Sequence, residues 1–312
     1  ARGGRMSVEA VALASASGAR KRAAAYLELT KPRVLAMVLL TTLVGFYLGS
    51  AERFDLWLAL NTLLGTALAA GGTLALNQYF ERRIDALMIR TQHRPLPEGR
   101  LSPPESLVFG LVTTVGGCAW LWVAANFLAA AVTAAIALLY LFAYTPLKRV
   151  SWLCHAVGAV PGALPPVAGW AAASGRLGLE PFILFLIMCL WQLPHSLSIA
   201  RLYQSDYARA GISMLPLSGE RGNPRVNPRL NPVDKLILLD CIALIAAGAL
   251  PTLLGFAGWI SMAVALALGA MMLTFGMRLA RNPNAAAAAR RVMFASLLYL
   301  PIVFLVIVLD RV

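Results

Sequence analysis

Residues 77–97 read NQYFERRIDALMIRTQHRPLP, and they follow directly on an apolar run long enough to cross a membrane. Asn77, Glu81 and Asp85 recur every four residues. If the apolar run continues as a helix, this spacing places three oxygen-bearing side chains along one stripe of its surface. Side-chain oxygens are the ligands that a hard divalent cation such as Mg²⁺ prefers. The pattern therefore predicts a metal site at the end of a membrane span.

Two arginines, Arg90 and Arg94, follow the acids in the same segment, and we expect Pro95 and Pro97 to end the helix. A guanidinium group binds phosphate oxygens through pairs of parallel hydrogen bonds. Acids for a metal next to arginines for phosphate indicate a site for a diphosphate with an apolar tail. The alternative is an ordinary helix end at the membrane surface, where acids and arginines pair with each other.

Composition identifies an all-α integral membrane protein. Of the 312 residues, 59% are hydrophobic and only 13% are charged, whereas soluble domains carry about 25% charged residues. Each apolar run is close to the roughly 20 residues that a spanning helix needs. We expect nine spans, at about residues 34–50, 56–76, 105–124, 127–144, 152–173, 178–198, 234–256, 258–279 and 291–309.

The net charge of +13 reflects topology and does not indicate a nucleic-acid partner. With a cytoplasmic N-terminus, every Lys and Arg except Arg53, Arg176 and Arg311 lies in or beside a cytoplasmic segment. This bias is the positive-inside pattern of multi-pass proteins. It predicts a protein of the cell (inner) membrane with its C-terminus on the opposite side.

The chain is expected to form one domain over residues 25–312. Residues 1–24 are rich in Ala, Gly, Ser and Arg and are predicted to be disordered. Residues 219–232 repeat Asn-Pro and are predicted to form a flexible loop. The four cysteines lie in apolar spans without CxxC spacing, so they are interpreted as small buried side chains.

A second polar segment, residues 144–149, separates spans four and five. Tyr144 offers an aromatic hydroxyl at the span end, whereas Lys148 and Arg149 are either phosphate ligands or plain topology anchors. His155 and a run rich in Gly and Pro follow, which we expect to bend the fifth span. That run is either a packing face for other helices or the wall of a ligand site.

A third polar segment begins with Trp191 and Gln192 and includes His195. Polar groups inside a membrane span are costly and are usually functional. The alternative for His195 is a hydrogen bond between two helices. Asp206 follows on the same side of the membrane as Asp85, where it could complete the coordination of a second metal ion.

Together these segments resemble the UbiA superfamily of intramembrane prenyltransferases, and within it the branch that farnesylates heme. The resemblance covers residues 29–216 in order. The residues that carry it are LTKPR at 29–33, the segment from Asn77 to Leu96, YTPLKR at 144–149, GAVPGALPPVAG at 158–169, WQLPH at 191–195 and the segment from Asp206 to Pro216.

The resemblance implies a nine-helix bundle with a cytoplasm-facing cavity, in which a farnesyl group passes from farnesyl diphosphate to a vinyl group of heme B. Heme B is a substrate here and Mg²⁺ is the cofactor. The implied metal ligands are Asn77, Glu81, Asp85 and Asp206. The implied catalytic set adds Tyr144 to these four, as a group that stabilises the allylic cation.

The remaining roles implied by the resemblance concern the two substrates. The implied diphosphate ligands are Lys31, Arg90, Arg94, Lys148 and Arg149. The implied heme contacts are Trp191, His155 and His195, through iron or a propionate. Association with a heme A synthase or a terminal oxidase assembly is a further implied partnership.

Two positions depart from the family pattern. The middle acid of the first motif is Glu81 where the family has Asp, which keeps a carboxylate but changes its reach. Many relatives carry an acid four residues before Asp206, and this chain has Leu202 there. The second departure weakens a metal role for Asp206.

Three other functions stay open on the sequence. One is a UbiA-type prenyltransferase that acts on an aromatic or quinone precursor. A second is a secondary transporter of an anionic metabolite, although we find no internal repeat of the kind such transporters show. The third is a heme-binding assembly protein, which would have no use for the acid stripe.

Overall fold

The computed structural model describes residues 8–50, 53–212, 214–215, 232–281 and 286–312, and these residues contain helices but no strand. The helices are α1 (Val8–Leu29), α2 (Pro32–Gly49), α3 (Leu56–Asp85), α4 (Pro103–Ala124), α5 (Phe127–Leu138), the π-helix η1 (Leu139–Tyr144), α6 (Thr145–Leu147), α7 (Cys154–Ala163), α8 (Pro165–Ser174), α9 (Leu179–Leu202), α10 (Gln204–Arg209), α11 (Pro232–Leu253), α12 (Trp259–Arg281) and α13 (Ala286–Leu309).

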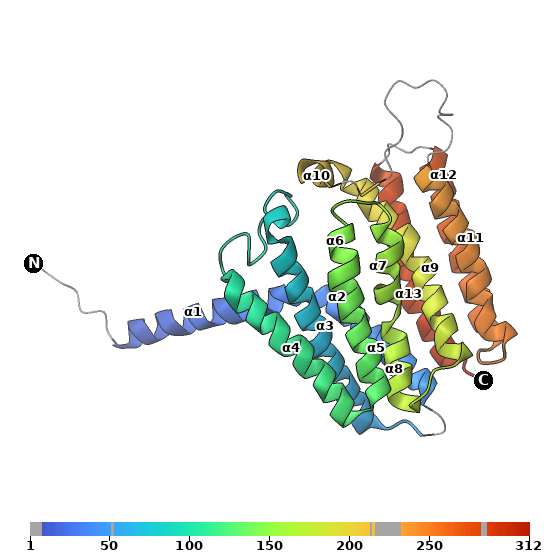
Figure 1. Cartoon of the computed structure of the whole chain (residues 1–312). Coiled ribbons are helices and arrows are strands. Elements are labelled where there is room, and N and C mark those ends of the chain that lie inside the picture. The colour runs from blue at the N-terminus through green and yellow to red at the C-terminus, as the bar shows by residue number, and fades with distance from the viewer. Residues whose placement is uncertain (1–7, 51–52, 213, 216–231, 282–285) are drawn as a thin grey trace, which may run out of the picture.

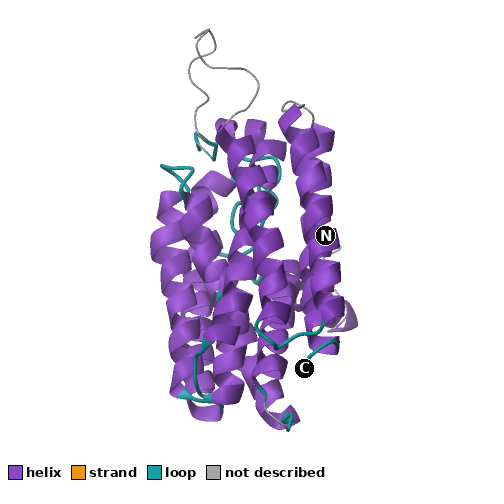
Figure 2. Cartoon of the chain, turned by 90° about the vertical axis from the view of Figure 1, so that its right-hand side faces the viewer, coloured by secondary structure: helices purple, strands orange, loops and turns teal. Residues whose placement is uncertain are grey.

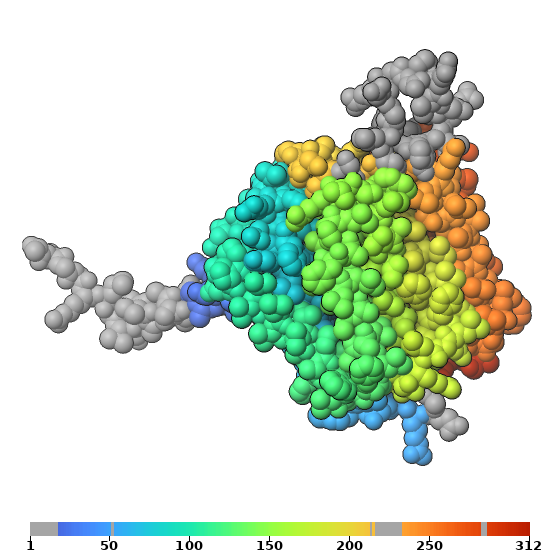
Figure 3. Space-filling view, in the orientation of Figure 1, coloured from blue at the N-terminus to red at the C-terminus, as the bar shows by residue number. Residues whose placement is uncertain are grey.

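Nine spans within the described residues are long and apolar enough to cross a membrane, which confirms the predicted multi-pass fold. The long helices run side by side along one axis (Figure 2). Helix α9 packs against α7, α11 and α13, while α3 packs on α4 and α2 on α8. With side chains drawn in full, α4 to α9 close one face of the bundle, and α11 forms its edge (Figure 3).

Residues 1–24 were predicted to be disordered and residues 219–232 to form a flexible loop, and the structure describes only part of each segment. Residues 8–24 of the segment predicted to be disordered belong to α1, which begins at Val8 and runs across the bundle axis (Figure 1). Ala and Arg, which are frequent in this segment, are strong helix formers. The end of α1 is anchored by Ala25 and Leu29, which are buried against α3 and the segment that follows it. Of the predicted loop at 219–232, residues 219–231 lie outside the described residues, and Pro232 begins α11.

Helix α3 is longer than a membrane span. Its first turn is capped by the Asp55 side chain, which accepts a hydrogen bond from the Leu58 amide at 2.9 Å. Thirty residues at 1.5 Å each extend over about 45 Å, against about 30 Å for a bilayer core. The last turns of α3 carry the acids. They lie toward the same end of the bundle as α6 and α10 (Figure 1).

The expectation that α3 continues as far as the prolines at 95 and 97 is wrong. The helix ends at Asp85, and turns follow it through residue 100. The Asp85 carbonyl accepts from the Thr91 hydroxyl at 2.9 Å and from the Met88 amide at 3.4 Å, while the Ile89 amide that would continue the helix donates to Asp206. Arg90 and Arg94 therefore lie on a loop that can fold back over the helix end.

The fifth span is broken, as its glycines and prolines predict. Helix α7 ends at Ala163 and α8 begins at Pro165, because a proline ring cannot continue the hydrogen bonding of the preceding turn. Helix α8 then lies very close to α2. An ideal Cβ at Gly169 would lie 1.9 Å from the Thr42 carbonyl oxygen, so only glycine fits this contact.

Replacing Gly169 by Ala is expected to destabilise the protein by about 1–3 kcal/mol, because the added methyl group would push the backbones of α2 and α8 apart. Gly116→Ala is the matched control, since a Cβ at this helical glycine would meet nothing within 4 Å. Thermal unfolding in detergent measures both variants. Equal melting temperatures for the two would contradict the close contact.

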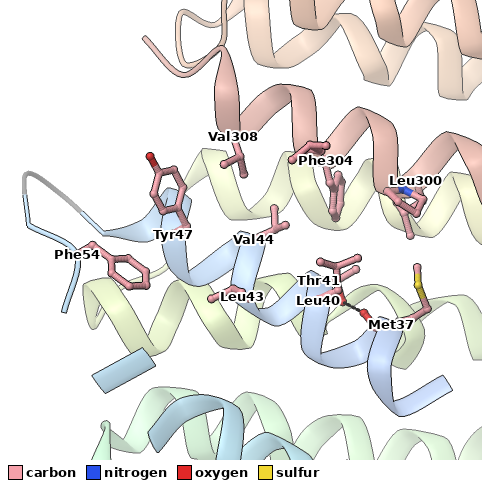
Figure 4. Close-up of a pocket in the computed structure, with 12 residues that line it drawn as sticks. Met37, Leu40, Thr41, Leu43, Val44, Tyr47, Phe54, Leu300, Phe304 and Val308 are labelled. Atoms are coloured by element: carbon pink, nitrogen blue, oxygen red, sulfur yellow. Dashed lines mark hydrogen bonds between the residues drawn. The ribbon is translucent and has the colours of Figure 1, made fainter. Parts of the chain in front are cut away.

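An apolar groove of about 280 Å³ lies between α2 and α13 (Figure 4). Its walls include Met37, Leu40, Val44, Leu300 and Phe304. No charged side chain is among its lining residues, so it offers no cation to a diphosphate. The polar chemistry of the molecule lies elsewhere, at the end of α3.

Candidate active site

The acid stripe forms as its spacing predicts. Asn77, Glu81 and Asp85 lie on the last turns of α3, and each is at most 3% exposed. Buried polar groups are tolerated only with hydrogen-bond or charge partners. The partners of these three side chains come from other parts of the chain and define the site.

A cation lies against each member of the stripe. Lys31 donates to Asn77 Oδ1 at 2.8 Å. Lys148 reaches both oxygens of Glu81, at 2.9 and 3.1 Å. These contacts join the segment before α2 and the segment after α6 to the end of α3.

Arg94 completes the cluster from the loop after α3, donating to Asp85 Oδ2 at 2.7 Å. The cluster thus holds three cations, Lys31, Lys148 and Arg94, against two carboxylates. When Lys31 is protonated, one positive charge is left over in a largely buried site, which favours binding of an anion.

The environment alters the basicity of the two lysines in opposite directions. Burial, with repulsion from Arg94, lowers the pKa of Lys31 to about 7. Burial alone would also lower the pKa of Lys148, but its pairing with Glu81 raises that pKa above the ordinary value. Lys148 is therefore a permanent cation at neutral pH, whereas Lys31 can change its charge there.

The donor set fits a magnesium ion that is completed by its substrate. Asp85 Oδ1 is buried and has no hydrogen-bond partner, so one carboxylate oxygen is free to bind a cation. No group of three or more His, Cys, Asp or Glu in the described residues could hold a metal by itself. Magnesium is usually bound by one or two carboxylates together with phosphate oxygens and water, which agrees with this arrangement.

Asp206 occupies a different position from the one expected of a metal ligand. Its two oxygens accept hydrogen bonds from the backbone amides of Ile89 and Arg90, both at 3.1 Å. Arg209 also lies 3.5 Å from Oδ1. Asp206 thus fastens the loop after α3 onto α10, and the structure does not bring it into one ligand group with the α3 acids.

Two predicted diphosphate ligands also point elsewhere. Arg90 is exposed, with its guanidinium 5.0 Å from the Tyr203 ring, and donates to the Tyr207 hydroxyl at 3.3 Å. Arg149 is exposed and donates to the Phe80 carbonyl at 2.6 Å. Neither contacts the α3 acids, whereas Lys31, Lys148 and Arg94 each contact a member of the stripe.

An aromatic pair lies next to the cluster. Tyr144 belongs to η1, and its ring centroid is 5.0 Å from that of Tyr140. The adjacent Thr145 accepts a hydrogen bond from Asn77 Nδ2 at 3.1 Å, which ties this segment to α3. Tyr140 and Thr91 were not predicted as site residues. For Tyr140 the available signal was its position four residues before Tyr144, on the same helix face.

The Tyr144 ring fits closely against the next span. An ideal Cβ at Gly158 would lie 2.5 Å from the Tyr144 ring, so the glycine leaves room for the ring. π-Helical segments such as η1 are rare and often occur at functional sites.

The candidate heme contacts lie on α7 and α9. His155 is buried on α7, while His195 on α9 is half-buried. Trp191 stacks on His195, with the ring centroids 5.0 Å apart and the planes at 14°. The structure thus brings Trp191 and His195 together, and places His155 on a neighbouring helix.

A sequence model of the UbiA prenyltransferase family matches residues 38–298. A protoheme IX farnesyltransferase of Solibacter usitatus is 43% identical, over 92% of this chain and 98% of its own. Another from Koribacter versatilis is 41% identical, over 92% and 93%.

Solved structures share the fold. One is a digeranylgeranylglyceryl phosphate synthase (TM-score 0.72, 17% identity, 93% of this chain and 98% of that one). Another is a UbiA homolog from Archaeoglobus fulgidus bound to DMAPP and Mg²⁺ (TM-score 0.61, 17% identity, 91% and 98%).

Proposed function

The chain belongs to the UbiA prenyltransferase family, and from this membership we propose that it transfers a farnesyl group from farnesyl diphosphate to a vinyl group of heme B to form heme O. The names of its relatives support the substrate pair. The observation on which the proposal rests is the buried cluster at the end of α3, with three cations, two carboxylates and one unpartnered carboxylate oxygen.

The three cations of the cluster are suited to bind the diphosphate, which is the leaving group of the reaction. Farnesyl diphosphate carries several negative charges, and Lys31, Lys148 and Arg94 would replace part of its hydration with fixed positive charge. The bond between farnesyl C1 and oxygen breaks with its electron pair on the diphosphate. Arg94 and Lys148 would exchange some of their contacts with the acids for contacts with phosphate oxygens.

Magnesium belongs to this proposal as a cofactor. Glu81 and Asp85 would hold it, with Asn77 beside them, and the free Asp85 oxygen supports that assignment. When bound, Mg²⁺ supplies charge neutralisation for the departing diphosphate. The solved structure of a UbiA homolog bound to DMAPP and Mg²⁺ supports the same pairing of metal and prenyl diphosphate.

The aromatic pair is suited to stabilise the allylic cation that remains when the diphosphate leaves. An allylic cation is attracted to the faces of aromatic rings, and Tyr140 and Tyr144 lie beside the cluster at the level of Asn77. The vinyl group of heme then forms the new carbon–carbon bond, and water adds to the second cation with loss of a proton. The apolar bundle keeps other water away from the first cation.

Location and partners complete the proposal. The distribution of Lys and Arg supports the cell (inner) membrane, with the N-terminus in the cytoplasm and the C-terminus on the opposite side. Because heme O remains in the membrane, a heme A synthase or a terminal oxidase assembly is the expected associate.

A turnover assay in liposomes with heme B, farnesyl diphosphate and Mg²⁺ tests the function, with the product identified by mass spectrometry. We expect a product with the mass of heme O. Chelation of the metal by EDTA is expected to lower turnover at least tenfold, and added Mg²⁺ to restore it. Prenylation of a hydroxybenzoate or naphthoate instead of heme would agree with the proposed diphosphate site but would contradict heme B as the acceptor.

A further inference from the structure

Ser296 on α13 holds two aromatic side chains of α9 in fixed positions. Its carbonyl accepts a hydrogen bond from Trp191 Nε1 at 2.6 Å, and its hydroxyl lies 2.7 Å from His195 Nδ1. The Trp191 and His195 rings are nearly parallel. Because the histidine is held both by the hydroxyl and by the stacked indole, its ring orientation is set before any ligand binds.

The hydrogen bonds of Ser296 also favour one tautomer of His195. The Ser296 hydroxyl donates its one proton to the Met293 carbonyl, at 2.6 Å. With its proton on that carbonyl, the hydroxyl accepts the contact with His195, an arrangement in which Nδ1 carries the proton. Nε2 of the neutral ring then has a lone pair, and it has no hydrogen-bond partner among the described residues.

The other two histidines lack such a nitrogen. His155 Nε2 lies 2.9 Å from the Met214 carbonyl, which can only accept, so this nitrogen is protonated. His155 Nδ1 lies 3.0 Å from the Ser196 hydroxyl. Both nitrogens of His93 also have polar partners, and its side chain is 73% exposed.

We propose that Nε2 of His195 binds the iron of the heme substrate, an inference that rests on the proposed function. Metal-binding histidines usually donate their other N–H to a second protein group, which fixes the tautomer and the ring plane. Ser296 would fill that positioning role. Iron in heme proteins is commonly held by one histidine in an apolar pocket.

The position of His195 fits an acceptor that is dissolved in the membrane. It lies in the span Leu179–Leu202, seven residues from the C-terminal end of that span, which corresponds to about 10 Å of helix. An uncompensated polar atom at this depth marks a functional position. Ligation there would hold the porphyrin inside the bundle, on the helix that also packs against α7.

Titration of the purified protein with ferric heme B, without farnesyl diphosphate, tests the assignment. The wild-type protein is expected to show the Soret band and electron paramagnetic resonance spectrum of histidine-ligated heme. His195→Asn keeps a donor toward Ser296 but removes Nε2, and is expected to lose that spectrum and to bind heme at least tenfold more weakly. His155→Asn is the matched control and should retain histidine ligation.

Ser296→Ala provides a second variant that leaves His195 in place. Loss of the group that fixes the tautomer is expected to weaken heme binding about 10–100-fold, while excess heme still gives a histidine-ligated spectrum. Size-exclusion profiles and melting temperatures establish that each variant is folded.

The outcomes separate this inference from the function on which it rests. Heme O production by a wild-type protein whose heme spectrum and affinity are unchanged in His195→Asn would overturn the ligand assignment alone. Histidine ligation that disappears in His155→Asn would do the same. A wild-type protein that binds no heme and prenylates a different acceptor would overturn the proposed function itself.

Discussion

Replacing Asp85 by Asn is expected to lower turnover by at least about 10²-fold, the effect of removing one group that stabilises charge in a transition state. Asp85 is 1% exposed, with Oδ2 bound to Arg94 at 2.7 Å and Oδ1 without a partner. An amide has the same shape but no charge. It would weaken metal binding and leave Arg94 without its counter-ion, while the end of α3 keeps its packing.

The matched control is Asp240→Asn on α11. Asp240 is also buried, at 6% exposure, and one of its carboxylate oxygens also has no partner, but it contacts none of the α3 cluster. Its variant should turn over within about threefold of wild type. Turnover is measured as heme O formed per minute at saturating Mg²⁺. An Asp85→Asn protein with more than a tenth of wild-type turnover would contradict the metal assignment.

Replacing Lys148 by Met is expected to cost about 3–5 kcal/mol of stability, because removing one partner of a buried ion pair leaves the other charge uncompensated. The side chains of Lys148 and Glu81 are 11% and 4% exposed, and two short contacts join them. Thermal unfolding in detergent should show a large drop in melting temperature. Arg149→Met, at the exposed neighbouring cation, should change it little.

A double variant distinguishes the ion pair from simple loss of packing. Adding Glu81→Gln to Lys148→Met removes the stranded charge, so the double variant should be more stable than Lys148→Met alone. A double variant as unstable as the sum of its two single variants would show that the pair does not act as a unit. Both variants are expected to lose turnover, since each removes a member of the site.

The order of the helices and the acid stripe could be predicted from the sequence because both are local properties. Apolar runs of about 20 residues reveal spans without knowledge of their neighbours. The four-residue spacing of Asn77, Glu81 and Asp85 determines their common face as soon as α3 is helical. Local helix propensity also explains α1, which composition had suggested would be disordered.

The assignment of cations to the site could be predicted only in part. Lys31, Lys148 and Arg94 were expected near the diphosphate together with Arg90 and Arg149. All five are basic residues beside a membrane surface, and sequence cannot separate those that contact an acid from those that bind a carbonyl or an aromatic ring. Lys148 and Arg149 are neighbours in the chain, yet one is buried on Glu81 and the other is exposed.

An all-helical membrane protein with an acid stripe at the end of one span follows from the sequence alone. Which groups face that stripe follows from the packing of the helices. Lys31 and Asn77 are 46 residues apart, and Lys148 and Glu81 are 67 apart. Asp206 lies 117 residues from the amide of Ile89 that it binds, and this contact uses the carboxylate to hold a loop. Such pairings depend on how helices pack against one another, and no periodicity within one segment records that packing.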